Sequence, residues 1–264
     1  MRRSVPGMVI PCDEAARSGA GSRTTFSESW CLVAEAESLN MKPAVDAACD
    51  GELAVRVSGA SYVRGGYRSF EFADVSVRAG EVVALLGGEA RFSRDLLLAI
   101  AGAVRPTSGS VTAPKAVGLG VFSDVADVDG VLTVEEVVAR ELREPGAGDI
   151  LAYLARHNLA THADQRVDRL DAGARARLSI ALAFAGGPEA AVVDLRDPFC
   201  YGLTAAEEVE VVRELCVLAR ATRTAVAVAV AEPTSCDSVD AAIPLDIAAT
   251  EALSQKTVLE GADA

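Results

Sequence analysis

The sequence has no run of about 18 uncharged apolar residues, the length at which a segment becomes a candidate membrane-spanning helix. We therefore expect no such helix, and no signal peptide either, because Arg2 and Arg3 are not followed by an apolar segment. Basic residues are also scarce: 25 Lys and Arg face 38 Asp and Glu, a net charge of −13. This balance argues against nucleic acid as a general partner, since nucleic-acid binding needs a basic surface.

Patterns that bind metals are missing too. The two histidines, His157 and His162, are five residues apart, which does not place them on one face of a helix. None of the six cysteines forms a CxxC pair. The sequence thus predicts no metal site, and it favours reduced thiols in a cytosolic protein.

Composition divides the chain into three parts. Residues 1–50 are rich in Ser, Gly, Arg and Pro without a sustained hydrophobic period, so we predict a disordered extension. An alternative is that translation starts at Met41, which leads directly into the first strand. Residues 51–247 are predicted to form one domain, followed by a polar tail at 248–264.

The domain is organised around residues 81–109, EVVALLGGEARFSRDLLLAIAGAVRPTSG. A buried strand, a glycine turn and an apolar helix in this order are typical of the start of a phosphate-binding α/β unit. Ser93 would be a good helix N-cap, and Asp95 would lie in the first turn, where the helix dipole favours an acid. We therefore expect protein groups to close this loop without a ligand.

Other segments extend the pattern on both sides. Two strands, 53–62 and 69–77, flank a glycine turn and predict an antiparallel pair. Thr133 and Glu136 form the two ends of a capping box, and Asp171 is a suitable N-cap for the next apolar helix. Further apolar segments are predicted as a strand ending in acids (188–198), a helix (207–219), a strand (224–231) and a last strand (238–245).

The order and spacing of these segments over residues 53–246 resemble the ATP-binding cassette (ABC) family, the nucleotide-binding subunits of ABC transporters. The IAG–PTSG turn, the LTVEE helix start, the ARLSIALA helix and Gly202-Leu203 carry the resemblance. It implies an α/β, P-loop NTPase-like cassette with a mixed sheet core, an antiparallel β-subdomain and a helical subdomain at about 131–172. It also implies ATP and Mg²⁺ as ligands and ATP hydrolysis as the family activity.

The phosphate loop departs from the family pattern GPNGAGKST. The family's lysine falls at Ser93 and its magnesium-binding hydroxyl at Arg94, while two of its glycines fall at Ala90 and Phe92. A phenylalanine opposes close approach of a phosphate, and Glu89 adds negative charge. The resemblance nevertheless places a degenerate phosphate loop at Gly87, Gly88, Ser93, Arg94 and Asp95.

The remaining family positions are altered as well. The signature serine falls at Asp171 and its second glycine at Gly173, and an acid there would repel a partner's triphosphate. No glutamine lies near Ser123, and no histidine follows the strand that ends at Ala231. Tyr62 is either the family's adenine-stacking aromatic or simply a half-buried strand residue.

Two alignments compete at the strand that ends in acids. Either Asp194 takes the place of the magnesium aspartate, with Leu195 at the catalytic glutamate, or Asp197 takes the glutamate position and Arg196 that of the aspartate. In both, Asp194 and Asp197 are remnants of a pair that the family uses for catalysis. Hydrolysis is thus expected to be absent or very weak.

The resemblance therefore predicts a degenerate ABC subunit that acts as a structural or regulatory partner of a permease, of an ATP-competent cassette, or of both. It would lie in the cytoplasm, on the inner face of the membrane where a permease holds it, as a homodimer or heterodimer. Two alternatives stay open. The chain is an active ATPase with an atypical loop, or it is a cytosolic binding module no longer linked to transport.

Overall fold

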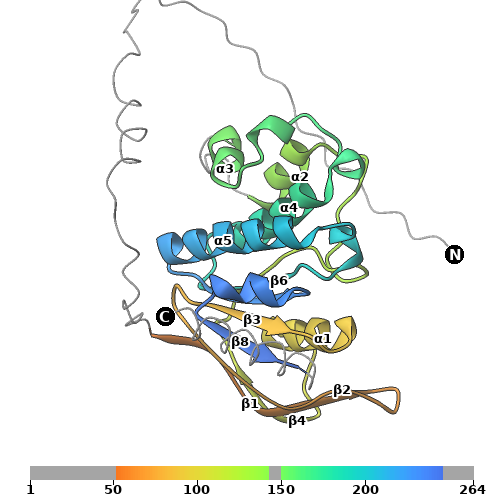
Figure 1. Cartoon of the computed structure of the whole chain (residues 1–264), viewed down its shortest axis with the longest axis vertical. Coiled ribbons are helices and arrows are strands. Elements are labelled where there is room, and N and C mark those ends of the chain that lie inside the picture. The colour runs from red at the N-terminus through yellow and green to blue at the C-terminus, as the bar shows by residue number, and fades with distance from the viewer. Residues whose placement is uncertain (1–51, 143–149, 246–264) are drawn as a thin grey trace, which may run out of the picture. The chain divides into compact units, whose positions relative to one another are not determined.

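The computed structural model describes residues 52–142 and 150–245. The expectations for residues 1–50, for a start at Met41 and for the tail at 248–264 lie outside these ranges. Within them, no helix is both long and apolar enough to cross a membrane. Figure 1 shows the strands and helices of these two ranges.

A three-stranded antiparallel sheet has the order β2-β1-β4. Its strands are β1 (Leu53–Arg64), β2 (Tyr67–Arg78) and β4 (Ser108–Thr112). The alternation in β1 buries Val55 and Val57 while their neighbours stay more exposed, as expected for a sheet with one face on a core. The predicted antiparallel pair is confirmed, and β4 was not foreseen from the sequence.

The second sheet has five strands in the order β5-β6-β7-β3-β8, and all four pairings are parallel. Every residue of β3, β6 and β7 is buried, because both faces of the sheet are covered. The expected mixed pairing is thus divided between two sheets, one antiparallel and one parallel. The strands are β5 (Val117–Leu119), β6 (Ala190–Asp194), β7 (Ala225–Val230), β3 (Val82–Leu86) and β8 (Ala241–Pro244).

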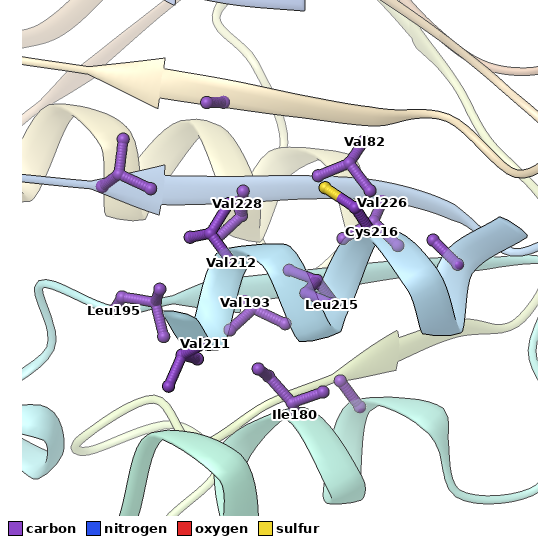
Figure 2. Packing of buried hydrophobic residues seen from close by; sticks show 14 of the residues in the cluster. Val82, Ile180, Val193, Leu195, Val211, Val212, Leu215, Cys216, Val226 and Val228 are labelled. Atoms are coloured by element: carbon purple, nitrogen blue, oxygen red, sulfur yellow. The ribbon is translucent and has the colours of Figure 1, made fainter. Parts of the chain in front are cut away.

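Helices and the small sheet cover the two faces of the parallel sheet. Figure 2 shows α5 (Ala205–Thr222) laying Val212, Leu215 and Cys216 against β3, β6 and β7, and α4 (Ala172–Phe184) extends this layer. On the opposite face, α1 (Ala90–Ile100) and the three-stranded sheet form a second apolar cluster. Burial of these aliphatic side chains is the main term that stabilises the fold.

A helical region has its own core. It contains α2 (Val134–Glu141), α3 (Ile150–Arg156) and two short 3₁₀ turns (Ala160–His162 and Val167–Arg169), which pack on one side of α4. The capping box predicted for Thr133 and Glu136 is confirmed, with both reciprocal hydrogen bonds present. Leu154, Leu159 and Leu178 are fully buried at its centre.

Candidate functional site

The segments of interest meet at the carboxyl-terminal edge of the parallel sheet. The loop after β3, the turn after β6 and the turn after β7 all leave the sheet there, because these strands run in the same direction. In open α/β sheets this edge is where ligands bind. The side chains that meet at this edge therefore decide what the site can do.

The backbone of the loop after β3 requires glycine. Gly87 and Gly88 have φ angles of +78° and +66°, which residues with a side chain rarely adopt. A Cβ at Gly88 would also lie only 3.2 Å from the Leu245 Cβ and 3.3 Å from the Phe92 ring. Phe92 is thus packed against the loop, beside the glycine that the sequence placed in the phosphate loop.

The start of α1 corrects two predictions. The N-cap is Glu89, which makes no side-chain cap hydrogen bond, and not Ser93. Ser93 is fully buried inside the helix, where its hydroxyl donates to the Ala90 carbonyl at 3.0 Å. Asp95 lies beyond the first turn and accepts a 2.6 Å hydrogen bond from the Ser69 hydroxyl of β2. Both polar groups are therefore used in packing α1, which sequence reasoning missed because the helix begins three residues earlier than Ser93.

The group that contacts the loop most directly is Arg196, from the turn after β6. Its Nη1 donates to the Gly87 carbonyl at 2.6 Å and its Nη2 to the Gly88 carbonyl at 2.7 Å. A third, longer contact joins Nη1 to the Ser93 hydroxyl at 3.5 Å. The loop thus presents two consecutive carbonyls to a cation. The sequence placed Arg196 only at the position of the magnesium aspartate, in one of two alignments, and predicted no contact with the loop.

Asp197 connects three segments at this edge. Its side chain is completely buried and accepts a 3.0 Å bond from Arg94 of α1. It also accepts bonds from the backbone N–H and hydroxyl of Ser123, after β5, and from the N–H of Phe199. Arg94 donates in addition to the Ser123 carbonyl. Both carboxylate oxygens are therefore already bonded within the protein.

Asp194 ends β6 and is almost completely buried. One oxygen accepts a 2.9 Å bond from the Arg196 N–H. The pKa of Asp194 is raised from 3.8 to about 7, with burial as the largest cause. The nearby Asp197 acts in the same direction, while the backbone bond from Arg196 and the charges of Arg196 and Arg94 oppose the rise. The structure brings both remnant acids to one edge, and it sets Arg196 between them and the loop.

The start of α4 has the predicted cap. Asp171 accepts a 2.7 Å hydrogen bond from the Ala174 N–H, which confirms it as the N-cap. Gly173 lies in the first turn, and a Cβ there would be 3.3 Å from Nη1 of Arg177. Nearby, Arg175 donates to the carbonyl of Tyr201, a residue that is 84% exposed.

Tyr62 lies on β1, half-buried in the cluster under the three-stranded sheet. Its ring is tilted by 34° to that of Phe70, with 6.1 Å between the centroids. This packing is that of a strand tyrosine in an apolar cluster. A stacking role toward adenine stays a prediction.

Sequence reasoning missed a further buried acid, Glu208 of α5. Its carboxylate accepts bonds from the N–H groups of Ala231 and Glu232, at 3.0–3.2 Å, and from the hydroxyl of Ser235 at 2.7 Å. It therefore holds the turn after β7, where the family places its histidine. Its helical position alone gives no sign of this, because Glu207 beside it is a surface residue of a capping box.

The arrangement of the strands and helices matches solved cassettes. CbiO1 from Clostridium perfringens, described as part of the ABC transporter complex cbiONQ, aligns with a TM-score of 0.62 over 80% of this chain and 94% of that one, at 18% identity. The chain has an ABC cassette fold. The fold predicted from the sequence is thereby confirmed.

Sequence comparison finds similarity to import ATP-binding proteins. The cassette is 31% identical over 143 residues to the zinc import ATP-binding protein ZnuC of Roseobacter denitrificans, covering 53% of this chain and 55% of that protein. It is also 31% identical over 146 residues to the taurine import ATP-binding protein TauB of Burkholderia pseudomallei, covering 50% and 55%. The cassette is thus related to ATP-binding subunits of ABC transporters, although it spans only about half the length of these curated relatives. No family model matches the sequence.

Proposed function

We propose that this chain is a degenerate cassette subunit of an ABC transporter-type complex that does not hydrolyse ATP. It would act as a structural or regulatory partner of a permease, an ATP-competent cassette, or both. The observation that supports this most is the pair of hydrogen bonds from Arg196 to the Gly87 and Gly88 carbonyls. A phosphate loop binds its ligand through backbone N–H groups that converge on an anion, whereas these two loop carbonyls face a cation.

The residues around the loop do not fit a magnesium nucleotide. Mg²⁺ needs oxygen ligands and a cassette supplies a hydroxyl and a carboxylate, but the Ser93 hydroxyl donates to a helix carbonyl and both Asp197 oxygens are bonded. The position of the hydroxyl is taken by Arg94, which is paired with Asp197. The protein's own guanidinium groups thus supply positive charge where the family uses a lysine and a metal ion.

Partners and location follow from the relatives. The relatives described above are import ATP-binding proteins, and CbiO1 is part of a transporter complex. A cassette of this kind would bind a membrane permease from the cytoplasmic side, and it would pair with a second copy or with another cassette. The acid that caps α4, Asp171, would then oppose a triphosphate held by the partner.

Purified full-length protein tests the proposal. Calorimetric titration with Mg-ATP should show no saturable binding over the roughly 1 µM to 1 mM range in which enzymes commonly bind their substrates. Phosphate release should equal that of buffer, with the protein alone and after addition of the partner that co-purifies from native membranes. Saturable binding with turnover, in either state, would overturn the proposal and favour the active-ATPase alternative.

A series of variants distinguishes the effect of the altered loop residues on ATP binding from the effect of Arg196. The triple variant Phe92→Gly, Ser93→Lys, Arg94→Ser restores the family residues of the loop but leaves the guanidinium on the two carbonyls. We expect it to bind ATP no better than the wild type, and we expect binding only when Arg196→Asn is added. Binding by the triple variant alone would show that Arg196 does not block the loop. Thermal unfolding of each variant confirms that it is folded.

The cytosolic-module alternative has a separate readout. Affinity purification from solubilised native membranes, followed by mass spectrometry, should recover a membrane permease with the chain. Recovery of soluble proteins only would favour a module that has left transport. This experiment does not depend on nucleotide binding, so the two parts of the proposal can fail independently.

A further inference from the structure

A cavity of about 330 Å³ lies on another part of the molecule, between α3, the residues after α4 and the carboxyl-terminal part of α5. Its volume is in the range of small-molecule sites. None of the residues that meet at the edge of the parallel sheet lines it. The side chains that shape the cavity are Tyr153, Arg156, His157, Phe184, Leu218 and Thr222.

One wall of the cavity is aromatic. The rings of Tyr153 and His157 have centroids 4.6 Å apart, and Phe184 continues the row at 6.3 Å from His157. The Tyr153 hydroxyl donates to the Ala181 carbonyl at 2.6 Å, which fixes its ring. A row of rings held in this way favours a planar aromatic ligand, because offset and tilted aromatic pairs are favourable beyond their buried area.

The imidazole of His157 supplies an unmet polar group. The residue is only 6% exposed, and among the described residues no group hydrogen-bonds to either ring nitrogen. By contrast, the Nδ1 of His162 contacts the Gln165 side chain at 2.9 Å. The hydroxyls of Thr222 and Thr224 already donate to backbone carbonyls. Among the described residues, the one fully enclosed side-chain nitrogen or oxygen without a partner is Arg175 Nε, so the His157 ring nitrogens reach solvent, where a ligand atom or water can bond to them.

Charge at the cavity is positive. Arg156 lines it, is exposed to solvent and forms no ion pair with any described residue. The pKa of His157 is lowered to about 4, chiefly by burial and also by Arg156, so the imidazole is neutral near pH 7 and offers one N–H donor. In a chain with a net charge of −13, an unpaired arginine beside such a donor is suited to an anion.

We propose that this cavity binds a small planar aromatic carboxylate. Its ring lies against Tyr153 and Phe184, and its carboxylate pairs with Arg156 and accepts the N–H of His157. This site is independent of the proposed function, because it shares no residue with the loop after β3. A bound ligand would contact both α3 and α5, because residues of both helices line the cavity.

The probe is 2-naphthoate, with the uncharged 2-naphthamide as its partner control. We expect calorimetry on the full chain to give a dissociation constant below about 1 mM for the carboxylate and weaker binding of the amide. Because the chain has only two histidines, nitrogen-15 NMR resolves both imidazoles. The His157 ring signals should move on titration while those of His162 stay in place.

Three variants and one matched control locate the site. Arg156→Gln should weaken binding roughly fivefold, equivalent to about 1 kcal/mol, because the arginine is exposed. His157→Phe keeps the aromatic wall but removes the donor, so it should also weaken binding. Ala152→Trp fills the cavity from an exposed lining position and should abolish binding of the probe. The control Ala155→Trp lies on the same helix outside the cavity lining and should bind the probe as the wild type does.

The result that would overturn the proposal is an unchanged His157 signal at saturating probe, or equal affinity of the wild type and Ala152→Trp. Either would show that naphthoate binds elsewhere. Should Ala152→Trp fail to fold, the exposed Arg156→Gln substitution and the choice between carboxylate and amide still decide the matter. Equal affinity in both of those comparisons would also reject the site.

Discussion

Removal of the Arg196 guanidinium should destabilise the loop after β3 more than any exposed charge does. In Arg196→Met the two hydrogen bonds to the Gly87 and Gly88 carbonyls are lost, while the backbone bond to Asp194 is kept. Hydrogen bonds to charged groups contribute roughly 1.5–3 kcal/mol each. Since the side chain is partly buried and water can reach the carbonyls in its place, we expect a net loss of about 2–4 kcal/mol in the free energy of unfolding.

The matched control is Arg91→Met in the same loop region. Arg91 is 52% exposed, pairs with Glu89 and lies over the Phe92 ring at 5.3 Å. Exposed pairs and cation–π contacts of this kind contribute up to about 1 kcal/mol. Urea unfolding of both variants at pH 7, with unchanged m-values, gives the two losses directly.

A loss for Arg196→Met that equals the loss for Arg91→Met would refute the reasoning. It would mean that water replaces the guanidinium at the two carbonyls at little cost. In that case Arg196 could also yield to a phosphate, and the main support for a non-hydrolysing cassette would be removed. A loss of the expected size would show that the loop depends on an internal cation for its conformation.

Three further predictions concern other groups at this edge. Gly88→Ala should cost more than Gly65→Ala, because both have positive φ but only Gly88 has neighbours within 4 Å; urea unfolding gives the difference. The pKa of Asp194 in the folded protein is about 7, above its ordinary 3.8. The stability that this shift contributes is therefore complete below about pH 3.8 and is lost as the pH rises to 7. Chemical denaturation should show Asp194→Asn gaining stability relative to the wild type over that pH range. Glu208→Ala should speed amide hydrogen exchange in the turn after β7, and unchanged exchange there would refute its anchoring role.

Local signals predicted much of the fold. The capping box at Thr133 and the aspartate cap of α4 depend only on residues three apart, and both are confirmed. Apolar periodicity located the buried strands to within one or two residues at β3 and β7. The prediction that Ser93 caps α1 was wrong. Cap preference favours serine over glutamate, but the N-cap is Glu89 and α1 begins at Ala90.

The site itself could be predicted only in part. The family resemblance named Gly87, Asp194 and Asp197 as neighbours of a phosphate loop, and the structure brings their segments to one edge of the sheet. The role of Arg196 could not be predicted, because its partners are more than 100 residues away along the chain. The same holds for Glu208, whose partners lie on a turn that no local pattern connects to α5.

The buried carboxylate of Asp197 has a consequence for motion. It bonds at once to α1 through Arg94, to the segment after β5 through Ser123, and to its own turn through Phe199. Release of any one segment would remove a partner from the buried Asp197 carboxylate, and an uncompensated charge inside the protein is costly. These three segments should therefore open as a single cooperative unit, with one shared exchange rate under conditions in which opening is rate-limiting.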